Sequence, residues 1–152
     1  KHQHSEWEYW SLMNGTGYDF DFIVPKAGCP KSVLEIVEIL RIVNLNPCAA
    51  KITRLQPRTS FHFHTDPLWK INPQLPEGYA VRLHIPILSN NNSWYETRHE
   101  RLYMKEGVVY LLDVSQEHRV ANDHDYIPRL HLVVTVVDKG NVSRNLRVSD
   151  GL

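Results

Sequence analysis

The chain has 152 residues, of which 42% are hydrophobic and 22% charged, values that are ordinary for one soluble globular domain. Lysine plus arginine equals aspartate plus glutamate, so the formal net charge is zero, and this excludes the basic excess of a typical nucleic-acid-binding protein. No apolar run is long enough to cross a membrane, and no signal-peptide pattern is present. We expect a single cytoplasmic domain over residues 1–152, with neither nucleic acid nor membrane as partner; its oligomeric state stays open.

The expected elements begin with one or two short strands and a turn in the aromatic-rich first thirty residues. An amphipathic helix follows over residues 32–44, where Val, Leu and Ile recur at helical spacing. Ser32 and Glu35 fit a capping box at its start, and Asn46-Pro47 ends it.

After this helix the chain reads as strands rich in Val, Ile, Leu and Tyr. One helix followed by many short strands favours a β-sandwich or barrel with a helical buttress. The predicted strands cover residues 51–56, 81–88, 107–113 and 129–137, and the turn clusters between them cover 72–78, 89–93 and 122–125.

Two of these strands carry an Arg-x-His pair on one face, because alternate side chains of a strand point the same way. Arg82 and His84 form the first pair, and Arg129 and His131 form the second. Such a face is costly to bury unless anions or hydrogen bonds satisfy it. The two pairs therefore predict a polar cavity inside the sandwich.

The composition offers two further hints. Nine histidines are many for this length. Cys29 and Cys48 form no CxxC pair and no zinc-ligand spacing, so free thiols in a reducing compartment are expected, with a disulfide as the alternative.

The segment His62-Phe63-His64-Thr65-Asp66 holds a candidate metal site. In an extended chain His64 and Asp66 project to the same side, and His118, expected on the turn after the third strand, is the best third ligand. Two imidazoles and a carboxylate suit Fe(II) and leave room for a chelating cosubstrate and O2. His62, His99 and His124 are the rival ligands.

Arg129 strengthens this interpretation. A dicarboxylate that chelates iron at one end needs a cation at the other, and an arginine can hold that carboxylate with two hydrogen bonds. The alternative is that Arg129 pairs with an acid such as Asp123 or Asp125.

The sequence resembles the aspartyl/asparaginyl β-hydroxylase family of Fe(II)/2-oxoglutarate dioxygenases, which includes bacterial free-proline hydroxylases. Five blocks, together spanning a core of about residues 51–138, carry the resemblance: Arg54-Leu-Gln-Pro-Arg-Thr-Ser-Phe-His-Phe-His-Thr-Asp66, Arg82-Leu-His-Ile-Pro-Ile87, residues 107–113, His118 with Asn122, and Arg129-Leu-His-Leu132.

The resemblance implies a mainly β, cupin-like jelly roll, the double-stranded β-helix, with one or two buttressing helices. It implies that His64, Asp66 and His118 hold the iron. It also implies that Arg129, assisted by Thr53, binds the far carboxylate of 2-oxoglutarate, and that Arg82 and His84 line the cosubstrate site.

The implied reaction is hydroxylation of an amino acid, free or within a peptide and resembling Asp, Asn or Pro, with release of succinate and CO2. Animal aspartyl hydroxylases have Gly where this chain has Asp66, so its motif is more like that of the bacterial enzymes. Two alternatives stay open: a non-catalytic jelly-roll module that binds a small ligand, and a cupin-type metal-dependent hydrolase or isomerase.

The substrate mouth is predicted in the loops around residues 67–80 and 89–100. Arg54 or Arg58 is a candidate for holding a substrate carboxylate. The aromatic candidates at the mouth are Trp69, Tyr79, Trp94, Tyr95 and Tyr103.

Overall fold

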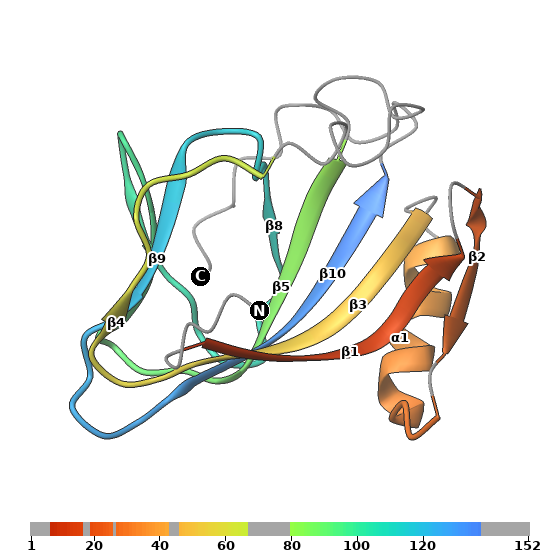
Figure 1. Cartoon of the computed structure of the whole chain (residues 1–152), viewed down its shortest axis with the longest axis horizontal. Helices are drawn as coiled ribbons and strands as arrows, with labels where there is room; N and C mark the ends of the chain where they lie inside the picture. Colours follow the sequence, from red (N-terminus) through yellow and green to blue (C-terminus); the bar gives the residue numbers. More distant parts are fainter. Residues whose placement is uncertain (1–6, 17–18, 26, 43–45, 67–79, 138–152) are drawn as a thin grey trace.

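Two antiparallel sheets face each other, and one helix covers the outer face of the larger sheet (Figure 1). This is a computed structural model, and it describes residues 7–16, 19–25, 27–42, 46–66 and 80–137. Within these residues the larger sheet has six strands, in the order β2 (Asp19–Pro25), β1 (Trp7–Thr16), β3 (Asn46–Leu55), β10 (Arg129–Val137), β5 (Ala80–Leu88) and β8 (Tyr110–Leu112). The smaller sheet has four, in the order β4 (Thr59–Ser60), β9 (His118–Asn122), β6 (Ser93–Thr97) and β7 (Arg101–Tyr103). The mainly β prediction is confirmed.

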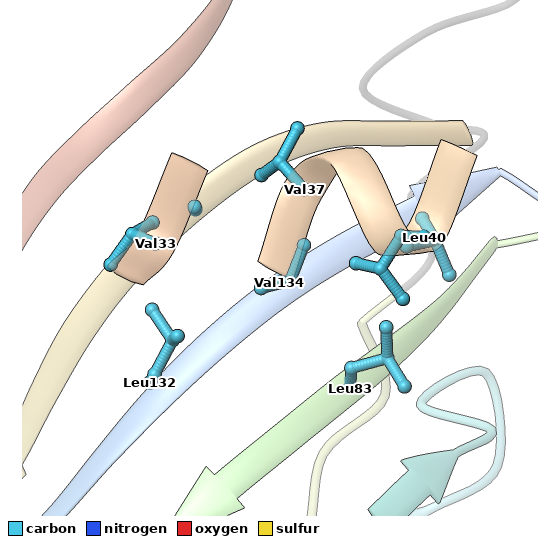
Figure 2. Close-up of a cluster of buried hydrophobic side chains, with 8 residues drawn as sticks. Val33, Val37, Leu40, Leu83, Leu132 and Val134 are labelled. Carbon is cyan, nitrogen blue, oxygen red and sulfur yellow. The ribbon is translucent and has the colours of Figure 1, made fainter. Parts of the chain in front are cut away.

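The helix α1 (Lys31–Ile42) packs its apolar stripe against the larger sheet. Figure 2 shows Val33, Val37 and Leu40 of α1 above side chains of β5 and β10. The sheet contributes Leu83, Leu132 and Val134 to this core. Because strand side chains alternate, the other set on β10, which includes Arg129 and Val133, faces the interior between the sheets.

The start of the helix differs from the predicted capping box. The helix begins at Lys31, so Ser32 lies inside its first turn. Ser32 therefore cannot be the N-cap residue, which precedes the first turn of a helix. The carbonyl of Pro30 accepts hydrogen bonds from the N–H groups of Val33 and Leu34 instead. Glu35 forms an ion pair with Lys31 at 3.6 Å. The predicted last residues of the helix, 43–44, lie outside the described residues.

The predicted strands at 81–88 and 129–137 are confirmed as β5 and β10. The strand predicted at 51–56 is the second half of β3, and only residues 110–112 of the stretch 107–113 form a strand, β8. The short strands of the smaller sheet were not predicted. His118 therefore does not lie on a turn, as expected, but begins β9. Three of the five residues of β9 are polar, so its sequence shows no clear apolar alternation.

Two further expectations concern membranes and thiols. Among the described residues, no helix is both long and apolar enough to cross a membrane. Cys29 is a free thiol. The side chain of Cys48 and the turn at 72–78 lie outside the described residues.

Candidate metal and dicarboxylate site

His64 and His118 form an antiparallel bridge between the segment after β4 and the start of β9. The N–H of each residue donates to the carbonyl of the other, at 2.9 and 2.8 Å. Their ring centroids are 4.5 Å apart. The backbone pairing thus holds two imidazoles side by side at the mouth of the interior.

The same local geometry sets which ring nitrogen of each histidine is free. Nδ1 of His64 lies 2.8 Å from the carbonyl oxygen of His62, and Nδ1 of His118 lies 2.8 Å from that of Gln116. A carbonyl only accepts, so each Nδ1 carries the hydrogen and each Nε2 keeps its lone pair. Metal-binding histidines are commonly oriented in this way. Burial lowers the pKa of His118, which also favours the neutral, ligating form.

Asp66 completes the group. Its N–H donates to the carbonyl of Val114 at 2.8 Å, which fixes the strand-like segment beside β8. Its Oδ2 lies 3.9 Å from Nε2 of His118 and accepts a hydrogen bond from Nη1 of Arg82. In the described part of the chain, one group of potential metal ligands lies close enough together to bind one ion: His64, Asp66 and His118, with ligand atoms within 4.8 Å of one another.

The rival histidines lie elsewhere. His62 and His99 are exposed. Nδ1 of His124 accepts hydrogen bonds from the N–H groups of Tyr126 and Ile127, at 3.0 Å each, and so closes a surface turn. None of the three belongs to the ligand group.

A cavity of about 200 Å³ extends from this group into the space between the sheets. That volume is below the roughly 300–1,000 Å³ of drug-sized pockets, so the cavity suits a small metabolite. Among the described residues that line it, Asp66 is the one acid, while Lys51, Arg82 and Arg129 are cationic. The predicted residues His64, Asp66, His118, Arg129, Arg82, His84 and Thr53 all line it, together with Lys51, Leu55, Phe61, Tyr95, Val114, Val120 and Val133.

Arg129 is 5% exposed, and its Nη1 has no hydrogen-bond partner among the described residues. Its Nε donates to Nε2 of His131 at 3.0 Å. Burial lowers the pKa of Arg129 to about 10, which keeps the side chain cationic at neutral pH. Of the two alternative partners, Asp125 binds Arg58 at 2.7 Å on the surface, and Asp123 is exposed. Arg129 also borders a smaller hollow, where Ser89 and Trp94 have buried polar atoms with no partner in the ranges that the structure describes.

Arg82 and His84 lie on the cavity face of β5, as predicted, but have different neighbours. Arg82 is paired with Asp66, while its Nε is buried and has no partner in the described part of the chain. His84 is 8% exposed, and burial, reinforced by Arg129 and Arg82, lowers its pKa well below the usual range. Thr53 lies behind them on β3, and its hydroxyl donates to the carbonyl of His131 at 3.4 Å.

Sequence reasoning missed the polar lining residue Lys51, and it placed Tyr95 only among the aromatic candidates at the substrate mouth. Lys51 shares the face of β3 with Thr53, and an alternation pattern along β3 would have placed it in the cavity. Burial, followed by the charge of Arg82, lowers its pKa. Tyr95 stacks on the ring of His118 with centroids 5.1 Å apart, because β6 and β9 are neighbours.

The other aromatic and arginine candidates for the substrate mouth lie in different surroundings. Trp94 packs against Tyr103 with ring centroids 6.3 Å apart, and neither lines the large cavity. Arg58 is exposed, and Arg54 is half-buried with interactions of its own. Trp69 and Tyr79 lie outside the described residues.

Comparison with known proteins identifies the family of the chain. Residues 1–139 match the family model described as aspartyl/asparaginyl beta-hydroxylase. The chain belongs to this family. The family and the fold together support a hydroxylase of the 2-oxoglutarate–Fe(II) oxygenase type. No curated protein is similar enough in sequence to match.

Solved structures resemble this family member in fold. An oxidoreductase of the 2OG-Fe(II) oxygenase family from Burkholderia pseudomallei superposes with a TM-score of 0.65 at 12% identity, over 90% of this chain and 70% of that one. A predicted oxalate decarboxylase from Thermotoga maritima gives 0.46 at 15% identity, over 89% and 96%. A Cupin_2 domain of an Enterobacter cloacae transcriptional regulator gives 0.47 at 9% identity, over 87% and 96%. The two TM-scores below 0.5 carry no argument about the fold. The likeness to the Burkholderia pseudomallei oxidoreductase supports the predicted double-stranded β-helix.

Proposed function

We propose that this family member is an Fe(II)- and 2-oxoglutarate-dependent dioxygenase that hydroxylates an amino acid or amino-acid residue, releasing succinate and CO2. One observation carries the proposal. A two-histidine, one-carboxylate group and a buried arginine with an unpartnered Nη1 line the same small cavity. Few other reactions need both a metal with open positions and a cation for a distal carboxylate.

The donor set fits the metal. His64 and His118 offer neutral Nε2 lone pairs, and Asp66 offers a carboxylate oxygen beside them. Two imidazoles and one carboxylate are the facial set typical of non-haem Fe(II) oxygenases. Bound Fe(II) would supply O2 activation, whereas the protein supplies position and charge. Arg82 would hold Asp66 in place, because it already donates to the carboxylate.

The inner part of the cavity fits a dicarboxylate. Arg129 would bind the carboxylate farther from the metal, since its cation is buried and no acid neutralises it among the described residues. Thr53 would assist from β3, and His84 would donate a hydrogen bond from β5. Lys51 adds positive charge to the lining. With Asp66 committed to the metal, the cavity attracts anions.

Family membership and the cationic lining support a proposal for the substrate class. We propose a substrate that resembles Asp, Asn or Pro, either free or within a peptide. O2 is the second cosubstrate, and apolar lining residues such as Val114 and Val120 shield the reaction from water.

The test is succinate formation from 2-oxoglutarate with Fe(II) under air, screened over free amino acids and short peptides. The expected result is succinate release that one group of substrates stimulates and that omission of iron abolishes. A metal-dependent hydrolase or isomerase would convert its substrate without O2. A binding module would bind ligand and form no succinate with any substrate, and that result overturns the proposal.

A further inference from the structure

His131 lies beneath the cavity, on β10 between Arg129 and Val133, and is 1% exposed. Its neighbours across the sheet are Thr53 of β3 and Pro86 of β5. It does not line the large cavity itself. It is therefore a buried polar ring directly behind the residues proposed to bind the dicarboxylate.

The ring of His131 joins two of those residues. Arg129 donates from Nε to Nε2 of His131 at 3.0 Å, and its Nη2 lies 3.1 Å from Nδ1. Nδ1 of His131 also lies 3.4 Å from Nδ1 of His84, with the rings edge to face. A neutral imidazole has one acceptor and one donor. Because Nε of Arg129 donates to Nε2, the hydrogen of the neutral ring is on Nδ1, so Nη2 of Arg129 makes no hydrogen bond to Nδ1. Nδ1 then donates to Nδ1 of His84.

This arrangement fixes the hydrogen of His84 as well. When Nδ1 of His84 accepts a hydrogen bond from His131, the ring hydrogen of the neutral His84 must be on Nε2. His84 lines the cavity, and Nε2 is then its ring nitrogen that is able to donate to a ligand there. Two anion-binding groups, the guanidinium of Arg129 and the N–H of His84, are thus oriented by one ring.

The partner of a buried arginine is usually a carboxylate, which would cancel its charge. Here two candidate acids have other partners: Asp125 binds Arg58 and Asp66 binds Arg82. Burial, reinforced by Arg129 and His84, lowers the pKa of His131, so its ring is uncharged. A neutral ring orients Arg129 without consuming its positive charge, and that charge remains available to a ligand.

We propose that His131 is a positioning residue that holds Arg129 and His84 ready for the distal carboxylate of the cosubstrate, while leaving the charge of Arg129 unneutralised. This inference rests on the proposed function. It makes two separate demands on residue 131: a hydrogen-bond acceptor for Arg129, and no negative charge.

The test compares two ligands on the full chain loaded with Mn(II), which binds such sites without turnover. The first is 2-oxoglutarate, and the second is 2-oxopentanoate, which has the same chain length but no distal carboxylate. Calorimetry gives both dissociation constants, and their ratio measures recognition of the distal carboxylate. The ratio is a property of the folded protein, so loss of stability alone does not change it.

Three substitutions separate the two demands. His131→Leu removes the acceptor and should reduce the preference for 2-oxoglutarate roughly tenfold or more, as expected for lost hydrogen bonds to a charged group. His131→Gln restores a neutral acceptor and should recover most of the preference. His131→Glu differs from His131→Gln mainly in its negative charge, and it should abolish the preference for 2-oxoglutarate over 2-oxopentanoate. Val134→Ala, on the opposite face of β10, is the control for destabilisation and should leave the ratio unchanged.

The outcomes are distinguishable. If the unmodified protein does not prefer 2-oxoglutarate, the proposed function itself fails. If the unmodified protein prefers 2-oxoglutarate and His131→Leu has the same ratio of dissociation constants, only the role of His131 is overturned. A ratio that His131→Gln and His131→Glu change equally would overturn the requirement for a neutral residue. If His131→Leu does not fold, the Gln and Glu pair still decides the question.

Discussion

His64 and His118 are placed by backbone pairing and not by side-chain packing alone. Each donates its N–H to the carbonyl of the other, and each ring is anchored through Nδ1 to a carbonyl two residues earlier in the chain. The two Nε2 atoms are therefore set before any metal binds. This preorganisation explains why the ligand group is recognisable in the protein alone.

Replacing Asp66 should weaken metal binding sharply. Asp66→Ala removes the only carboxylate of the ligand group and leaves Arg82 without its acid partner. We expect Co(II) affinity, followed by its visible absorption, to fall roughly 100-fold or more, the upper end of the effects seen for groups that only support metal ligands. Asp125→Ala removes an exposed acid and is the matched control. Equal Co(II) affinity in both variants would exclude Asp66 as a ligand.

Replacing Arg129 should weaken 2-oxoglutarate binding with little effect on the metal. Removing one partner of a buried charge pair typically costs about 2–5 kcal/mol, because the other charge is left unpaired. Arg129→Ala should therefore raise the dissociation constant of 2-oxoglutarate by more than about 30-fold. Arg58→Ala, which removes an exposed arginine, should not change it. An unchanged constant in Arg129→Ala contradicts the assignment.

The buried histidines should make stability depend on pH. Burial lowers the pKa values of His84 and His131, so between their lowered values and the ordinary 6.5 the unfolded chain binds protons that the folded chain does not. Stability is therefore full above about pH 6.5 and falls as the pH decreases below it. Each histidine contributes a slope of up to about 1.4 kcal/mol per pH unit.

Urea unfolding between pH 7 and pH 5 measures this slope. His131→Gln removes one titrating group and should reduce the slope. Val134→Ala is the control: it should lower the free energy of unfolding at every pH and leave the slope unchanged. A free energy of unfolding that is the same at pH 5 and pH 7 would show that these rings are not held neutral.

The core under α1 should carry stability without affecting the site. Leu132 is 3% exposed and points toward the helix, away from the cavity (Figure 2). Leu132→Ala should cost about 2–5 kcal/mol in the free energy of unfolding. Ile42→Ala, at a side chain that is 78% exposed, is the control and should cost far less. A loss of 2-oxoglutarate affinity in the folded Leu132→Ala protein would contradict the separation of core and site.

The relationships within the candidate site that the sequence could predict are local ones. Asp66 follows His64 by two residues in an extended segment, so their common direction is a local property. The face shared by Arg82 and His84 follows from the same alternation. The pairing of Arg82 with Asp66 is not local, because residues 67–79 separate β5 from the segment that holds Asp66.

The smaller sheet was harder to predict. Its strands have two to five residues, and charged side chains such as Glu96 and Arg101 pair across them, so they lack a clear apolar pattern. The same limit explains why Tyr95 was placed in a loop although it stacks on His118. That contact depends on the pairing of β6 with β9.

The most direct test of the central claim is an anaerobic titration of the Fe(II)-loaded protein with 2-oxoglutarate, followed by visible absorption. Chelation of Fe(II) by a 2-oxo acid gives a charge-transfer band. The account predicts a saturable band that is lost in His118→Ala and requires a higher 2-oxoglutarate concentration in Arg129→Ala. No band at saturating Fe(II) and 2-oxoglutarate would contradict it.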